Sequence, residues 1–430
     1  MSSRARSAFL RALRALPALL VLLAPSSTVE GQAQPSLDDR IRGLLIGSFV
    51  GDALGGPIEF QPPEKVHALK DAPKVWRDDE VLDADARAAT VKRLRLRSYK
   101  DLRPQPESYG QWNIDSEPGT ITDDSRHKLV LLHSFRVVEK ANRWPFDVGD
   151  LAQAFLDWPL TSAVTDRPEY VALAADWLEE WQLGARWILG ERDLKLARPP
   201  ERMWNGVPTC CGQMSLPPLA ALFAGDPDRA YRAAYRLAFF DNGFGKDMNA
   251  ALVAGLAAAL TTSVELNSPG RAWDAVLSAV RKTDPYGHAK IRWSERPVDR
   301  WMNLALKLAK DSGGRPARLF AALEQEFLTT TKWEAQVPFV VDFACLAIAD
   351  YDPLVALQLT MEWGHDSDSY AQLLGAFIGA LHGAEIFPAE IRDPVERRLL
   401  ADHKVEIEAE CRLLIRLNKL GKTKTIVRYD

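Results

Sequence analysis

Two short clusters in the sequence concentrate carboxylates and hydroxyls immediately before apolar stretches. The first reads TDDS, at residues 122–125, and the second reads GHDSDS, at residues 364–369. Such residues often do no more than cap helices, because Thr, Ser and Asp accept hydrogen bonds from free backbone N–H groups and their charge suits the helix dipole. Both following stretches are apolar enough to be buried, however. Aspartates that converge in a poorly solvated centre repel one another strongly.

A divalent cation would remove that repulsion. Carboxylate and hydroxyl oxygens, without sulfur, suit a hard ion, which favours Mg²⁺ or Mn²⁺ over Zn²⁺. The four aspartates of the two clusters supply enough charge and enough bridging oxygens for two ions about 4 Å apart, an arrangement that orients and activates a water molecule. His365 lies inside the second cluster, but a single histidine is more often a hydrogen-bonding neighbour than a ligand of so hard a metal.

A third element, RGLLIGSFVGDALGGPIEF, spans residues 42–60. Gly43, Gly47 and Gly51 recur every four residues, which places them on one helix face where a neighbouring backbone can approach closely. The following Gly-Gly-Pro breaks the helix and presents Glu59. No GKS or GKT follows, so the glycines do not form a phosphate-binding P-loop. Taken alone, Glu59 could be a surface carboxylate past a helix end, and Asp52 a polar residue near a helix terminus.

The three elements, in this order, resemble the ADP-ribosylglycohydrolase family. In that family RhRGxhhGhhhGDALGxxhE, where h is apolar, is followed by TDDT or TDDS and then by GxDxDTxAxhxGAhxG. This chain has RIRGLLIGSFVGDALGGPIEF, TDDS and GHDSDSYAQLLGAFIGALHG. A fainter match relates MSLPPL, at residues 214–219, to the family's MRxxPL. The resemblance covers about residues 38–390.

The resemblance implies a compact, single-domain, all-α fold with a central binuclear metal site. It also implies roles for individual residues. Glu59 matches an acidic residue beside the metals and the substrate ribose, and is the candidate for water activation or proton transfer. The implied metal ligands are Thr122, Asp123 and Asp124 from one side and Asp366, Asp368 and Ser369 from the other. The candidate substrate contacts are Gly364, His365 and Asn242, although Asn242 also suits a simple turn.

The implied reaction is attack of a positioned water at the anomeric carbon of a ribose, through an oxocarbenium-like transition state. Its substrate would be an ADP-ribosylated protein or a small ADP-ribosyl compound. The chain departs from the family pattern at Ser215, which replaces the arginine of the MR pair, and at 240–243, where FDNG stands in place of Thr-His. Two other functions stay open: a non-catalytic structural or binding member of the fold, and a metal-dependent phosphohydrolase, because two-metal sites also serve phosphoryl transfer.

Helical periodicity dominates the chain and independently predicts an all-α protein. Ala, Leu and Val recur at three- and four-residue spacing in segments 129–140, 231–240, 247–260, 353–363 and 370–381. Strand-like alternation is scarce. The segment 74–119 is rich in charges and prolines, and is either a lid or binding element or a solvated surface insertion.

Composition and the N-terminal residues limit the possible partners and the location of the protein. The 430 residues carry a formal net charge of −4, which gives no basic stripe for nucleic acid as the main partner. Arginines, an apolar run at 15–24 and small residues thereafter predict a signal peptide over 1–33, a domain over 34–430, and a secreted or periplasmic location. An amphipathic N-terminal helix or a membrane anchor is the alternative, although that run is too short to span a bilayer comfortably, which takes about 20 residues. The cysteines, at 210, 211, 345 and 411, indicate free thiols or one long-range bridge rather than a disulfide framework.

Overall fold

The computed structural model describes residues 34–60, 73–98, 117–166, 168–265 and 269–429. The predicted signal peptide, at 1–33, therefore lies outside the described residues. Residues 35–430 form one unit by their internal contacts. Within the described residues no helix is long and apolar enough to cross a membrane.

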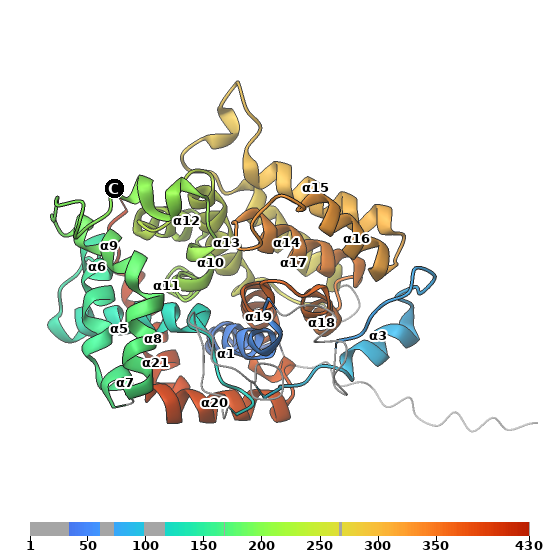
Figure 1. Cartoon of the computed structure of the whole chain (residues 1–430), viewed down its shortest axis with the longest axis horizontal. Helices are drawn as coiled ribbons and strands as arrows, with labels where there is room; N and C mark the ends of the chain where they lie inside the picture. The colour runs from blue at the N-terminus through green and yellow to red at the C-terminus, as the bar shows by residue number, and fades with distance from the viewer. Residues whose placement is uncertain (1–33, 61–72, 99–116, 167, 266–268, 430) are drawn as a thin grey trace, which may run out of the picture. The chain divides into compact units, whose positions relative to one another are not determined.

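Two helices from opposite ends of the sequence pack against each other at the centre of this unit. They are α1 (Leu37–Gly55) and α19 (Ser367–His382), and both are buried almost all round (Figure 1). A Cβ on Gly379 would lie 1.8 Å from the carbonyl oxygen of Gly43, and one on Gly51 would lie 1.9 Å from that of Ala371. Only glycine allows this backbone approach, which explains the four-residue glycine spacing in α1.

The pairs of contacts show that α1 and α19 run antiparallel. Gly43 meets Gly379, Gly47 meets Gly375, and Gly55 meets Ser367. The C-terminal end of α1 therefore lies beside the N-terminal end of α19. Residues that precede α19 and follow α1 are brought to the same place.

The other helices surround this pair (Figure 1). One group contains α5 (Asp123–Ala141), α6 (Val148–Asp157), α7 (Ser162–Thr165), α8 (Pro168–Trp177) and α9 (Glu179–Ile188). A second contains α10 (Cys211–Ser215), α11 (Leu219–Leu222), α12 (Pro227–Leu237), α13 (Gly245–Ala259), α14 (Pro269–Lys282), α15 (Pro297–Ser312), α16 (Pro316–Glu326), α17 (Gln336–Ile348) and α18 (Pro353–Trp363). The C-terminal α20 (Ala389–His403) and α21 (Ile407–Gly421) complete the set, and α21 packs on α1.

The predicted all-α class is confirmed. Each segment that the periodicity marked as helical corresponds to α5, α12, α13, α18 or α19. The helix α12 ends three residues earlier than predicted, at Leu237, and α13 ends one residue earlier, at Ala259. The only β-bridges among the described residues are two isolated pairs, Phe146 with Val427 and Thr209 with Glu334. The buried apolar side chains form one contiguous core.

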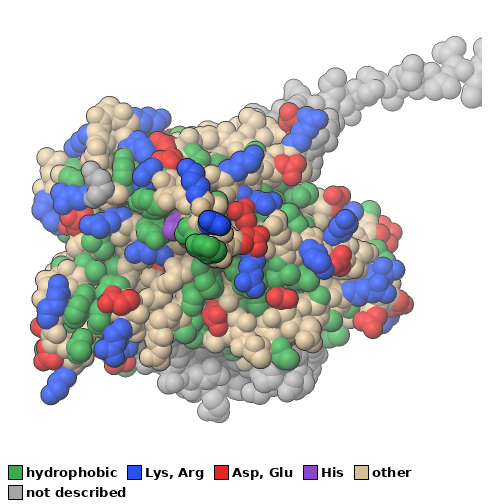
Figure 2. Space-filling view, turned by 90° about the horizontal axis from the view of Figure 1, so that it is seen from above, with side chains coloured by type: hydrophobic (Ala, Val, Ile, Leu, Met, Phe, Trp, Pro, Cys, Tyr) green, Lys and Arg blue, Asp and Glu red, His purple; other side chains and the backbone are tan. Residues whose placement is uncertain are grey.

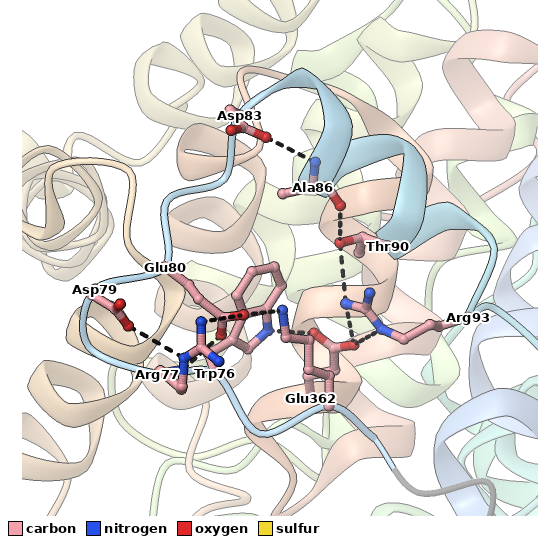
Figure 3. Close-up of polar contacts among 10 residues, drawn as sticks. Trp76, Arg77, Asp79, Glu80, Asp83, Ala86, Thr90, Arg93 and Glu362 are labelled. Atoms are coloured by element: carbon pink, nitrogen blue, oxygen red, sulfur yellow. Dashed lines mark hydrogen bonds and ion pairs between the residues drawn. The ribbon is translucent and has the colours of Figure 1, made fainter.

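The charged segment predicted as a lid or a surface insertion is described over residues 73–98, which include α3 (Ala84–Val91). Glu362 of α18 holds this segment: its buried carboxylate accepts hydrogen bonds from Trp76 Nε1 (2.7 Å) and Arg93 Nε (2.9 Å) (Figure 3). The backbone N–H of Leu82 donates to the carbonyl of Gly314 (2.7 Å). Residues 73–98 are thus docked on α18 and its neighbours, while residues 99–116 lie outside the described residues.

Candidate metal centre

The antiparallel packing of α1 and α19 brings three sequence motifs together. The GDALG end of α1, the TDDS start of α5 and the HDSDS start of α19 all meet there. Asp52, in the last turn of α1, accepts hydrogen bonds from Thr122 N (3.1 Å), Thr122 Oγ1 (2.6 Å) and Ser125 N (3.1 Å). Asp52 therefore fixes the first turn of α5 to α1. This positioning role was not apparent from the sequence, where Asp52 resembled any polar residue at a helix terminus.

The carboxylates of the two predicted clusters converge. One carboxylate oxygen from each of Asp123, Asp124 and Asp368 lies within 4.8 Å of the others, and the same holds for Glu59, Asp366 and Asp368. Asp368 belongs to both groups. Ser369 Oγ also donates to Asp124 Oδ1 (2.9 Å), across 245 positions of sequence. The structure thus brings together Glu59 and the four aspartates that the sequence singled out.

These aspartates are buried in a setting that disfavours their charge. Asp368 is 0% exposed and Asp366 4%. Burial, then the neighbouring Asp368, Asp123 and Asp366 carboxylates, raise the pKa of Asp124 well above its usual value. Burial and repulsion from Asp52 and Asp123 raise the pKa of Asp368 to about 7. The cluster therefore carries an uncompensated electrostatic cost.

The buried ammonium of Lys128 lies next to the cluster. Lys128, on α5, is 0% exposed, and its Nζ donates to the backbone carbonyl of Asp124 (3.1 Å). Burial lowers the pKa of Lys128 to about 8, against the opposing attraction of Asp124 and Asp52. A single ammonium cannot offset four or more carboxylates. A divalent cation would.

The donor atoms fit a hard divalent cation. Asp366 Oδ2 and Asp368 Oδ2 are buried without a hydrogen-bond donor among the described residues, which is rare for buried carboxylate oxygens. The hydroxyl of Thr122 donates to Asp52 and that of Ser369 donates to Asp124. Since those protons are engaged, the hydroxyl oxygens can offer only lone pairs to a further partner. An all-oxygen set of this kind suits Mg²⁺ or Mn²⁺.

The acidic cluster forms part of the wall of a cavity of about 640 Å³, a size typical of small-ligand sites. Glu59, Asp123, Asp124, Asp366 and Ser369 line it on the polar side. The remaining wall is mostly apolar and includes Phe60, Trp181, Trp204, Cys210, Cys211, Met214, Leu328 and Trp333. A bound molecule would contact carboxylates and aromatic rings together.

The aromatic wall was missed by sequence reasoning. Trp181, on α9, is held by stacking on His127 (ring centroids 4.0 Å apart) and by Phe240 (4.4 Å). Trp204 is fixed by its Nε1, which donates to the carbonyl of Phe240 (3.1 Å). In the sequence, tryptophans look like ordinary core residues. Nothing in their spacing distinguishes those that reach a cavity.

The predicted substrate contacts lie elsewhere. Asn242 Nδ2 donates to the carbonyl of Met203 (2.7 Å), as a turn residue would. His365 has φ +61° and its Nε2 lies 2.5 Å from Glu324 Oε1. With Gly364 (φ +83°) it forms the turn from α18 into α19. None of the three is among the residues that line the cavity, and their contact with a substrate stays a prediction.

The two departures from the family pattern have structural roles. Asp241 Oδ1 accepts from Gly212 N (3.0 Å) and its Oδ2 accepts from Asn249 Nδ2 (2.8 Å), so it holds the turn that carries Cys210 and Cys211 at the cavity. Ser215 is buried, and its Oγ donates to the carbonyl of Cys211 (3.1 Å). All four cysteines are buried free thiols. This agrees with the prediction of free thiols and not with that of one long-range bridge.

Comparison with known proteins agrees with this geometry. The ADP-ribosylglycohydrolase family model matches residues 33–422. The chain therefore belongs to the ADP-ribosylglycohydrolase family, a family of hydrolases that act on ADP-ribosyl substrates. This confirms the resemblance found in the sequence and extends it through α20 and α21.

Two further comparisons complete the findings. No curated protein matches the chain. A solved structure described as an "ADP-ribosylglycohydrolase-related protein complex" is similar at 17% sequence identity and a TM-score of 0.49, covering 89% of this chain and 99% of that one.

Proposed function

We propose that this protein is a metal-dependent glycohydrolase that cleaves the ribosyl glycosidic bond of an ADP-ribosylated protein or a small ADP-ribosyl compound. The observation that carries the proposal is the convergence of Asp123 and Asp124 with Asp366 and Asp368 at a cavity wall. A structural protein has no need to bury so many carboxylates in one place, because their mutual repulsion and desolvation cost stability.

Two cations, Mg²⁺ or Mn²⁺, fit the two carboxylate groups that share Asp368. Their ligands would be Thr122, Asp123, Asp124, Asp366, Asp368 and Ser369. When bound, they would supply Lewis acidity that polarises oxygen atoms of water and ribose. Helices α5 and α19 both begin at the cluster. The positive ends of their dipoles therefore favour the charged form of the carboxylates there.

Glu59 is the proposed proton acceptor. It follows the short helix η1 (Gly56–Ile58), lines the cavity and shares a carboxylate group with Asp366 and Asp368. From that position it would take a proton from the water that attacks the ribose anomeric carbon. The surrounding carboxylates stabilise the positive charge that develops on the sugar ring in the oxocarbenium-like transition state.

A substrate panel tests the proposal. Purified protein with Mg²⁺ or Mn²⁺ would be incubated with ADP-ribosyl-arginine, ADP-ribosyl-serine, O-acetyl-ADP-ribose and nucleosides. Release of ADP-ribose or ribose supports the proposal. Release of phosphate indicates a phosphohydrolase, and silence across the panel despite stoichiometric metal binding indicates a non-catalytic member of the fold.

A matched variant separates the proposed ligands from other buried acids. Asp124→Asn should abolish turnover and metal binding. Asp342→Asn, on α17, removes a carboxylate that is also buried. Its oxygens have no hydrogen-bond partner among the described residues, and it belongs to neither carboxylate group. It should leave metal binding unchanged. Equal losses in the two variants would contradict the ligand assignment.

We also propose export of the mature chain. This rests on the order of charged, apolar and small residues in 1–33. N-terminal sequencing of protein recovered from the periplasm or the medium tests it, and a mature N-terminus near residue 34 is the expected result. Recovery of the intact Met1 form from the cytoplasm alone would overturn it.

A further inference from the structure

A loop between α14 and α15 carries apolar side chains that the fold does not use. It spans residues 283–296, includes the short helix η4 (His288–Lys290), and projects from the helices at the top of Figure 1. Trp293 is 85% exposed, the largest value for a large apolar side chain among the described residues, and Ile291 is 52% exposed. Exposure of a whole indole to water is unfavourable, so this tip calls for an explanation.

The loop is held firmly at both ends. At its start, Asp284 Oδ1 accepts from His288 N and Oδ2 from Ala289 N, both at 2.8 Å. At its end, the buried Arg296 guanidinium binds Asp247 (2.6 Å) and donates to the carbonyl of Thr283 (3.0 Å). These contacts fix the base of the loop and present Ile291 and Trp293 outward in a preset position.

The loop together with the helix ends beside it, residues 281–300, is basic in an acidic protein. Residues 281–300 hold six Lys and Arg and three Asp and Glu, whereas the whole chain has a net charge of −4. Two of the six bases are already paired, Arg281 with Asp299 (3.3 Å) and Arg296 with Asp247 (2.6 Å). Four bases, Lys282, Lys290, Arg292 and Arg300, then stand against two acids, Asp284 and Glu295. Lys290 and Arg292 flank Ile291 in the sequence. Figure 2, which views the molecule from above, shows hydrophobic, basic and acidic side chains side by side on this face.

We propose that this loop binds the surface of a membrane that contains anionic lipids. Trp293 and Ile291 would enter the boundary between headgroups and acyl chains, where an indole can bury its ring and keep its N–H hydrated. Lys290 and Arg292 would contact lipid phosphates. The tip offers two large apolar side chains, which is far less than the roughly 1,200 Å² that a stable protein interface buries. A lipid surface needs no such area.

Binding in this way would leave the cavity free. None of the residues 281–300 lines the cavity that holds the acidic cluster. The inference therefore rests on observations independent of the proposed function. It concerns where the protein binds, at a membrane surface, and not which reaction it catalyses.

Vesicle co-sedimentation tests it. The full chain would be mixed with vesicles of phosphatidylcholine alone or with added phosphatidylglycerol. We expect binding to the anionic vesicles that weakens with salt, and a partition coefficient about tenfold lower for the double variant Ile291→Ser with Trp293→Ser. Lys290→Glu with Arg292→Glu should lower binding to anionic vesicles and not to neutral ones. The same variants are also compared in the proposed mature form, which starts at residue 34, because the Arg-bearing apolar segment 1–33 would itself bind anionic vesicles.

Leu160→Ser is the matched control, because Leu160 is 77% exposed but lies outside the loop. It should bind like the unaltered chain, and thermal unfolding midpoints should be equal across the set, since the changed side chains are exposed. Equal partitioning of all variants would overturn the proposal. So would loss of self-association in light scattering without lipid for the Ile291 and Trp293 variant, because the occupant would then be a second copy of the chain.

Discussion

The two ends of the α1–α19 pair share one packing geometry but treat their polar groups in opposite ways. At the far end Arg40, a buried guanidinium, donates to the carbonyls of Ala259 (2.9 Å) and Thr262 (2.5 Å) and so completes the end of α13. At the near end Asp366 and Asp368 keep buried oxygens without a donor among the described residues. Satisfied polar groups stabilise a fold, whereas several buried carboxylates that converge with oxygens lacking a donor mark a place where a cation is expected. The same helix pair therefore supports stability at one end and chemistry at the other.

The largest expected effect is on the shared packing. Gly379→Leu places a Cβ 1.8 Å from the Gly43 carbonyl oxygen, and because backbone cannot move aside the two helices must separate. We expect the free energy of unfolding to fall by more than about 5 kcal/mol, measured by urea denaturation, with loss of soluble protein as the extreme outcome.

Gly270→Ala is the control for this change. A Cβ on Gly270, in α14, meets only Tyr351 at an ordinary distance of 3.4 Å, so stability should change by less than about 0.5 kcal/mol. If both variants unfold alike, the close approach of α1 and α19 is not what glycine serves here.

Asp368→Asn should reduce turnover while it stabilises the metal-free protein, which distinguishes the acidic end of the helix pair from the opposite end. Because Asp368 belongs to both carboxylate groups, we expect turnover to fall about 1,000-fold, or about 4 kcal/mol of transition-state stabilisation. In the presence of a chelator the same variant should unfold at a higher temperature, since one buried carboxylate is removed from a repulsive cluster. Calorimetry with and without Mn²⁺ measures this, and a lower melting temperature in chelator would contradict it.

His382→Gln probes the opposite end through pH. Burial, then the nearby Arg40, lowers the pKa of His382 to about 4. Below about pH 6.5 the histidine is protonated in the unfolded chain but stays neutral in the folded chain. Its contribution to the free energy of unfolding is therefore complete above about pH 6.5 and is lost as the pH falls toward about 4. Between pH 7 and pH 5 the unaltered protein should lose about 1 to 2 kcal/mol more than the variant.

Denaturant titrations at both pH values give this double difference, in which titration of the other groups cancels. Parallel losses in the two proteins would show that His382 is not shielded from protonation.

Ser36→Ala tests the start of α1 and should have the smallest effect. Ser36 Oγ accepts from Asp39 N (3.1 Å) and caps the helix, so its loss should cost about 1 kcal/mol. Ser36→Asp keeps an acceptor and should restore most of the stability. Turnover at saturating metal should be unchanged in both, since the cap lies at the end of α1 away from the acidic cluster.

The sequence predicted the parts of this fold that rest on local periodicity and on rare residue types. Amphipathic repeats predicted the helices, and glycines at four-residue spacing predicted a close backbone approach. Paired aspartates at two helix starts predicted a convergence that the structure contains. These three predictions agree with the structure because each rests on a residue pattern that few other folds could accommodate.

The remaining parts of the site depend on tertiary contacts that leave no local pattern. Asp52 looked like a helix-end residue, yet it binds the backbone of α5. Trp181 and Trp204 were not among the predicted site residues, yet they line the cavity. Conversely, Asn242 and His365 were candidate substrate contacts because of their neighbours in the sequence, but their side chains bind Met203 and Glu324. Which way a polar side chain points is decided by packing between distant segments.

The distance along the chain between α1 and α19 has a consequence for how the protein is made. Ser48 and Gln372, which share a hydrogen bond of 3.1 Å, are 324 positions apart. Most residues of α1 are buried, so the nascent chain exposes an apolar helix whose partner is not yet translated. Loop closure over such a span is slow, and the acidic centre cannot assemble until synthesis has passed Ser369. Ribosome-bound chains that stop before α19 should therefore leave α1 open to proteases.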